Sequence, residues 1–213
     1  ARHPARAFAA DGVVRLVYAG AVTPTYELDV VIDAVARIRA ERPQLALSLD
    51  IFGRGDSEAT LQAAVDASGL AEVVTFHGRI PLEDVPAAIA ARDIGVAPTR
   101  RDPFTDISLS TKIFEYGAMA KPVVATRLPM VEATFPADTV VAYEAGDPDA
   151  LAAGLLALVD DAPGREARVA RTLALVRERS WEREAAVYLG VVERLISGDR
   201  DPSGDPRPVS SAR

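Results

Sequence analysis

The sequence has no cysteine, only two lysines and two histidines, and few aromatic residues (6%). The absence of cysteine excludes disulfides, thiolate zinc sites, iron–sulfur clusters and cysteine nucleophiles. His3 and His77 lie too far apart in the sequence to form a metal-binding motif. No apolar run approaches the roughly 18–20 residues that span a bilayer, and the N-terminus lacks the apolar segment of a signal peptide. We therefore expect a cytoplasmic protein that needs no metal or other cofactor.

The charge balance argues against two classes of partner. The 213 residues include 24 basic and 31 acidic side chains, which gives a net charge of −7. A nucleic acid or an anionic membrane surface attracts proteins of the opposite charge. We therefore expect no nucleic-acid partner.

Short apolar runs rich in β-branched residues alternate with longer segments of helical periodicity. The runs that predict strands are 13–20, 45–53, 73–78, 93–98, 122–126 and 139–143, and the segments that predict helices are 28–41, 57–69, 82–91, 108–119, 147–160, 165–179 and 181–196. This alternation predicts an α/β fold, a Rossmann-like doubly wound parallel sheet of six strands with helices on both faces. Residues 13–196 form the expected domain. Residues 1–12 are predicted to be a linker and residues 197–213 a disordered tail.

Four glycines, Gly20, Gly53, Gly55 and Gly78, follow the first three predicted strands. In an open parallel sheet the ligand crevice lies beyond the carboxyl ends of the strands, so we expect these glycines near a ligand. Arg54, in the loop FGRGD, either neutralises a diphosphate or is a solvated surface residue. The pattern around His77 is more typical of a loop residue than of a general base.

The segment from Asp106 to Thr126 is the most informative part of the chain. Ser108, Ser110 and Thr111 are residues that begin helices, so a helix starting near Leu109 would direct free N–H groups and the positive end of its dipole at the crevice. Such a helix start is an anion site. Lys112 in the first turn opposes the dipole unless an anion compensates, and Glu115 at i+3 can accept hydrogen bonds from vicinal sugar hydroxyls. The alternative is an ordinary surface Lys–Glu pair.

Seven segments together carry a family resemblance: VYAG, IFGRGD, VVTFHGRI, DIGVAPTRRD, KIFEYGAMAKPVVAT, GDPDALAAGLLALVDD and SWEREAAVYLGVVERLI. Their order and spacing are similar to the C-terminal, donor-binding half of a GT-B glycosyltransferase of family 4. The resemblance implies half of a GT-B fold and a retaining, metal-independent enzyme of glycan biosynthesis. It would transfer a sugar from a nucleoside diphosphate sugar to a glycan or lipid-linked acceptor.

The resemblance also implies roles for individual residues. Glu115 matches the glutamate that holds the ribose hydroxyls, and residues 76–80 match a base pocket. Lys112 and Glu115 are the expected catalytic residues. The full expected donor-binding set is Gly20, Gly53, Arg54, Gly55, His77, Gly78, Arg79, Ile80, Ser108, Leu109, Ser110, Thr111, Lys112 and Glu115.

The sequence departs from the family pattern at three charged positions. Ile107 stands where the family has a first glutamate, and Ala21 and Tyr26 stand near the positions of a diphosphate-binding arginine and lysine. Lys112, Arg54 and the predicted helix start at residues 108–111 are the remaining candidates to hold the diphosphate.

A GT-B enzyme has two Rossmann-like domains, and this chain has room for one. We therefore expect a missing N-terminal acceptor-binding domain as a partner, and any peripheral contact with a membrane would be made by that domain. By itself, this chain is expected to be an inactive fragment or one chain of a split enzyme. Two alternatives stay open. One is a degenerate domain that serves as a binding or scaffold partner. The other is half of a sugar-nucleotide epimerase, for which the sequence offers no evident carboxylate and histidine set.

Overall fold

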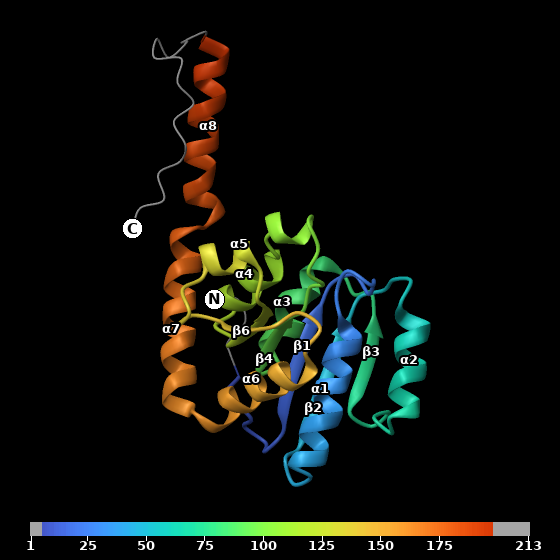
Figure 1. Cartoon of the computed structure of the whole chain (residues 1–213). Coiled ribbons are helices and arrows are strands. Elements are labelled where there is room, and N and C mark those ends of the chain that lie inside the picture. The colour runs from blue at the N-terminus through green and yellow to red at the C-terminus, as the bar shows by residue number, and fades with distance from the viewer. Residues whose placement is uncertain (1–5, 198–213) are drawn as a thin grey trace. The chain divides into compact units, whose positions relative to one another are not determined.

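The computed structural model describes residues 6–197, and within that range the chain forms one six-stranded sheet and eight α-helices (Figure 1). The strands are β1 (Val14–Ala19), β2 (Leu47–Phe52), β3 (Val74–Gly78), β4 (Ile94–Ala97), β5 (Val123–Thr126) and β6 (Val141–Tyr143). The helices are α1 (Leu28–Glu41), α2 (Glu58–Ala67), α3 (Val85–Ala90), α4 (Thr111–Ala118), α5 (Pro129–Thr134), α6 (Pro148–Asp160), α7 (Ala162–Glu178) and α8 (Trp181–Ser197). Short 3₁₀ helices cover Leu82–Asp84 and Thr105–Ile107.

The sheet has the order β3-β2-β1-β4-β5-β6, and all neighbouring strands are parallel. The chain first builds outward from β1 to β3 and then returns to add β4 on the other side of β1. This reversal confirms the predicted doubly wound α/β fold. It also separates the loops after β1 and β4, which opens a crevice at the carboxyl ends of these strands.

Both faces of the sheet are buried, as parallel sheets require. Alternate residues of β1 point to opposite sides: Leu16 and Tyr18 belong to one apolar cluster, and Val17 to the other. The first cluster includes residues of α1, α2 and α6, and the second includes residues of α3, α4, α5 and α7. In Figure 1, α1 and α6 lie together on the first of these faces.

Helices α4 and α5 are among those that differ from the sequence-based expectation. Helix α4 begins at Thr111 rather than near Leu109, and the preceding residues 105–107 form a 3₁₀ turn instead. Helix α5 was not expected, because its six residues are too few to show helical periodicity; Pro129 at its start is a favourable first-turn residue. Helix α6 follows Asp147 as expected, and the Asp147 carboxylate accepts hydrogen bonds from the Asp149 and Ala150 N–H groups, both at 2.9 Å.

The N-terminal residues that the structure describes, 6–12, pack onto the sheet-forming part of the chain, although the sequence predicts a linker there. The Ala9 N–H donates to the Asp93 carboxylate at 3.0 Å, and the Arg165 guanidinium lies 3.6 Å from the centroid of the Phe8 ring. The rest of the predicted linker, residues 1–5, lies outside the described residues.

The described part of the chain divides into two compact units, one ending at Val176 and one beginning at Arg177. The second unit contains α8, which has no buried residue. Apart from Ser197, the predicted disordered tail, 197–213, lies outside the described residues. Between residues 6 and 197, no helix combines the length and apolarity needed to cross a bilayer.

Candidate functional site

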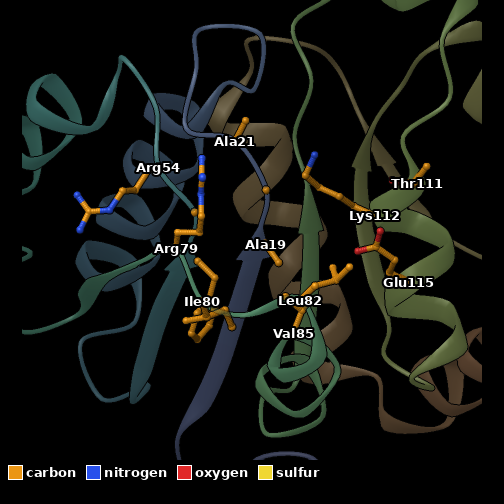
Figure 2. A pocket seen from close by; sticks show the side chains of 13 residues that line it. Ala19, Ala21, Arg54, Arg79, Ile80, Leu82, Val85, Thr111, Lys112 and Glu115 are labelled. Atoms are coloured by element: carbon orange, nitrogen blue, oxygen red, sulfur yellow. The ribbon is translucent and has the colours of Figure 1, made fainter.

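A cavity of about 370 Å³ opens at the carboxyl ends of the strands, where the strand order reverses (Figure 2). It is lined by Ala19, Gly20, Ala21, Phe52, Gly53, Arg54, Arg79, Ile80, Leu82, Val85, Thr111, Lys112 and Glu115. Figure 2 shows Lys112 and Glu115 of α4 on one side and Arg54 and Arg79, from the loops after β2 and β3, on the other. We call this the switch-point cavity.

The structure brings eight of the fourteen expected donor-binding residues to the switch-point cavity. These are Gly20, Gly53, Arg54, Arg79, Ile80, Thr111, Lys112 and Glu115. Ser108, Leu109 and Ser110 line a neighbouring cavity instead, and Gly55, His77 and Gly78 line neither.

Lys112 is the central charged group of the site. Its side chain leaves α4 almost completely buried, with 7% of the residue exposed. Within the described residues its ammonium makes no hydrogen bond and has no carboxylate within 4.0 Å, so the alternative of a surface Lys–Glu pair is wrong. Burial lowers the pKa of Lys112 to about 8, and the negative charge of Glu115 acts in the opposite direction.

The ammonium of Lys112 lies against two aromatic rings. Its Nζ is 3.6 Å from the centroid of the Tyr26 ring and 5.3 Å from that of Tyr18. Tyr26 is near the position at which the family resemblance expects a lysine. The loop after β1 thus has no lysine at this position, and the positive charge there comes from Lys112 of α4 instead.

The start of α4 faces the same region. Ser110 precedes the first helical residue with an extended backbone, and no side chain of the described residues caps the helix. The expected capping role of Ser108 is not observed, because its hydroxyl donates to the Phe104 carbonyl at 2.7 Å. The Ile113 N–H donates to the Ser110 carbonyl at 3.4 Å, so the Thr111 and Lys112 N–H groups are the ones that keep their capacity to bind an acceptor from outside the helix.

Close approach of two loops explains the glycines after β1 and β2. A Cβ on Gly53 would lie 1.7 Å from the Gly20 carbonyl oxygen, and Gly53 also has a φ of +141°. The Gly20 N–H donates to the Phe52 carbonyl at 2.9 Å. A Cβ on Gly20 would lie 2.3 Å from Cε of Lys112, so this glycine leaves room for the lysine side chain.

His77 supports the wall of the switch-point cavity rather than lining it. Its ring stacks on Phe52 with centroids 4.3 Å apart, and its Nε2 lies 2.5 Å from an Asp50 carboxylate oxygen. Arg92 makes two hydrogen bonds of 3.1 Å to the same carboxylate. Burial raises the pKa of Asp50, but these hydrogen bonds outweigh it and hold the pKa below its usual value.

Sequence reasoning missed Asp50, Phe52 and Arg92. A detectable signal existed only for Asp50, which is a carboxylate within the apolar run of β2. Phe52 and Arg92 have ordinary sequence contexts: Phe52 ends β2 and Arg92 lies just before β4, so only the folded chain brings Arg92 to the Asp50 carboxylate.

A second cavity of about 230 Å³ shares Thr111 and Lys112 with the switch-point cavity. Its lining is rich in hydroxyl groups, contributed by Thr25, Tyr26, Thr99, Thr105, Ser108, Ser110, Thr111 and Thr126. No carboxylate lines it. We call it the hydroxyl cavity. Lys112 therefore stands at the junction of two spaces of different chemistry.

The described residues contain no group of three histidine, aspartate or glutamate side chains placed to hold a metal ion. The charges in the switch-point cavity come instead from Arg54, Arg79, Lys112 and Glu115. The cavity thus combines positive charges, a helix start and an apolar wall, an arrangement suited to an anion attached to a flat or apolar group.

Comparison with known proteins agrees with this geometry. The chain is 28% identical over 201 residues to the D-inositol 3-phosphate glycosyltransferase of Arthrobacter sp. (strain FB24), covering 91% of this chain and 46% of the relative. Among solved structures, Anabaena Alr3699/HepE in complex with UDP and glucose superimposes with a TM-score of 0.73 at 19% identity, covering 87% of this chain and 49% of that one. The C-terminal domain of the glycosyl transferase group 1 family protein LpcC from Francisella tularensis gives a TM-score of 0.66 at 18% identity, covering 83% of this chain and 87% of that one.

The chain spans about half the length of the curated relative. The family model described as Glycosyl transferases group 1 matches residues 14–161, which is more than half of the chain. Together with a parallel sheet shared with glycosyltransferases of the GT-B type, this match shows that the chain belongs to the glycosyl transferases group 1 family.

Proposed function

We propose that this chain is the donor-binding half of a retaining glycosyltransferase and that the switch-point cavity binds a nucleoside diphosphate sugar. One observation carries the proposal: the buried ammonium of Lys112, without a carboxylate partner among the described residues, faces the cavity next to the start of α4. Leaving a charge so buried is costly unless a ligand compensates it. A diphosphate is such a ligand.

Each wall of the cavity suits a different part of the donor. Lys112 and the first-turn N–H groups of α4 hold the diphosphate, and Arg54, with a 65% exposed side chain, approaches it from the opposite wall. Glu115, three residues after Lys112, accepts hydrogen bonds from the ribose hydroxyls. Phe52 and Ile80 supply apolar surface for the base, and the sugar extends into the hydroxyl cavity.

The chemistry that this half supplies is mainly electrostatic. As the bond between the sugar and the diphosphate breaks, negative charge grows on the leaving group. Lys112 and the N–H groups of α4 are already in place to stabilise that charge. The acceptor, a glycan or a lipid-linked molecule, is held by a second domain, because the relatives that the chain matches are about twice as long.

Calorimetric titration with UDP, GDP, ADP and their common sugar conjugates tests the proposal. We expect at least one nucleoside diphosphate to bind, with an affinity that EDTA does not change. Loss of binding on chelation would show that a metal bridges the diphosphate. If none of these ligands binds, the chain is instead a degenerate domain that keeps the fold as a binding or scaffold partner.

A further inference from the structure

Two tyrosine rings, those of Tyr18 and Tyr26, contact the ammonium of Lys112, and contacts that do not involve Lys112 hold both tyrosines in place. Tyr18 lies in β1, is completely buried, and donates its hydroxyl to the Ala21 carbonyl. Tyr26 lies in the loop between β1 and α1, where its N–H donates to the Thr23 carbonyl at 3.0 Å. The two ring centroids are 6.0 Å apart with a 56° angle between the planes, so the rings form a corner. Lys112 ends in this corner.

The loop that carries Tyr26 is also fixed from the other side of the site. The Arg100 N–H, after β4, donates to the Thr25 carbonyl at 2.8 Å. The position of the Tyr26 ring is therefore set by backbone contacts of its own loop and of the neighbouring one. Lys112, whose long side chain has many rotamers, contributes none of these contacts.

An aromatic ring differs from a carboxylate as a partner for an ammonium group. The ring face attracts a cation but leaves its N–H groups available for other acceptors. A carboxylate in the same place would occupy those N–H groups and would repel a phosphate. The corner thus holds the ammonium without competing with an anionic ligand.

We propose that Tyr26 is a positioning residue for Lys112: its ring, together with Tyr18, holds the charged ammonium at the junction of the switch-point and hydroxyl cavities so that it meets the diphosphate of the donor. This inference rests on the proposed function, because it assigns Lys112 a phosphate ligand. It adds that the loop after β1 contributes to phosphate binding through an aromatic face rather than through a charge.

Two variants separate the ring from its hydroxyl. Tyr26→Phe keeps the ring face, and we expect it to bind UDP, or whichever nucleoside diphosphate binds best, as the wild type does. Tyr26→Leu keeps apolar cover but removes the ring. We expect it to weaken binding of that diphosphate on the order of 3- to 30-fold while leaving binding of the free nucleoside unchanged. In a Lys112→Ala background, the same Tyr26→Leu change is expected to have no further effect.

Lysine NMR provides a readout that needs no nucleotide. The chain has only two lysines, Lys112 and Lys121, so ¹³C labelling of the lysine ε-carbons gives two signals, and a Lys121→Arg variant assigns them. We expect the Lys112 ε-protons to be shifted upfield by the ring currents in the wild type and in Tyr26→Phe. The shift should shrink in Tyr26→Leu.

The outcomes distinguish this inference from the function on which it rests. If Tyr26→Leu loses the ring-current shift yet binds the diphosphate as tightly as the wild type, the positioning role is wrong and the proposed function stands. If Tyr26→Leu weakens binding of the diphosphate and of the free nucleoside equally, Tyr26 has only a structural role, which also overturns the inference. If the wild type binds no nucleoside diphosphate, the proposed function fails and the positioning role fails with it.

Discussion

At the scale of single residues, the feature that needs an explanation is a buried lysine without a carboxylate partner among the described residues. A cation loses hydration when it is buried, and Lys112 also lies in the first turn of α4, where the helix dipole disfavours positive charge. Two aromatic rings compensate part of this cost. An anionic ligand would compensate the rest of this cost. We therefore expect ligand binding to be most sensitive to substitution of Lys112.

We predict that Lys112→Ala weakens binding of a nucleoside diphosphate about 10- to 150-fold, because one charge-assisted hydrogen bond is worth about 1.5–3 kcal/mol. Binding of the free nucleoside should change little. Calorimetry with UDP and uridine, or the matching pair for the preferred base, measures the difference. Arg37→Gln on α1 is the control, since Arg37 is an exposed cation that pairs with Asp149 and does not line the cavity. Equal losses for both ligands would contradict a phosphate contact.

The protonation of Lys112 predicts a pH dependence. Among the described residues the charged group that acts on Lys112 is Glu115, whose negative charge raises the pKa of the lysine. Burial raises the pKa of Tyr18, the buried phenol beside it. The pKa of Lys112 in the protein without ligand is about 8, and a bound diphosphate favours the charged form of the lysine. The affinity for the diphosphate should therefore be constant below pH 8. Above it, affinity should fall by up to tenfold for each pH unit.

Lys112→Arg is the matched control for this pH dependence, because arginine stays protonated throughout the range. Titrations between pH 6.5 and 9.5, values chosen as roughly one and a half units either side of the Lys112 pKa, should show the decline in the wild type alone. A parallel decline in both proteins would assign the pH dependence to another group.

Glu115 is predicted to act on a different part of the ligand. Glu115→Gln should weaken binding of the ribonucleoside and of its diphosphate by similar factors, because a neutral amide oxygen is a weaker acceptor for ribose hydroxyls than a carboxylate. A 2′,3′-dideoxy analogue lacks these hydroxyls and should bind both proteins equally. If the variant loses the dideoxy analogue as well, Glu115 acts on the structure of α4 and not on the ribose.

At the scale of elements, the site depends on how closely the loops after β1 and β2 approach each other. We predict that Gly53→Ala lowers the free energy of unfolding by about 3–5 kcal/mol, since it combines backbone strain with a collision against the Gly20 carbonyl. Gly69→Ala is the matched control: Gly69 also has a positive φ, of +65°, but has open space around its Cβ position. It should cost only about 1 kcal/mol. Urea denaturation of both variants checks the difference, and equal costs would mean that the loop contact contributes nothing.

The same elements explain why α4 begins later than the sequence predicts. Ser110 does precede the first residue of α4, but Ser108 does not start the helix, because residues 105–107 already form a 3₁₀ turn that Thr105 anchors through hydrogen bonds with Arg100 and Asp102. Gly55, after β2, and Gly78, the last residue of β3, both have close neighbours in the packed loops. A Cβ on Gly55 would lie 2.2 Å from the Val22 carbonyl oxygen, and Gly78 borders the Arg54 side chain.

At the scale of the whole molecule, the first unit should be stable without α8. We predict that a chain ending at Ser180 unfolds within about 2 °C of the longer chain, because α8 has no buried residue whose loss would expose a core. A chain ending at Asp161 is the contrasting variant. It lacks α7, whose Thr172 and Val176 pack on Gly117 of α4, and should be clearly less stable. Calorimetric melting of the two shortened chains decides this, and a large loss on removing α8 alone would be evidence against the division at Val176.

Much of the fold could be predicted from the sequence, because strands and helices are set by short-range patterns. The alternation of β-branched runs with helical segments is sufficient to predict a doubly wound parallel sheet, and the order of seven short segments is sufficient to predict the family. The strand order comes from the structure instead, because short-range patterns do not determine which strands pair.

The tertiary structure alone decided the environment of each charged side chain. Lys112 and Glu115 are neighbours in the sequence pattern, but one is buried and the other exposed. The difference arises because Gly20 and Tyr26, distant from α4 in the sequence, form the space that Lys112 enters. Likewise, Asp50 of β2, His77 of β3 and Arg92, which precedes β4, become one network only in the folded chain. Periodicity determines which face of an element is apolar, whereas the desolvation of a charge depends on loops that only the assembled sheet brings together.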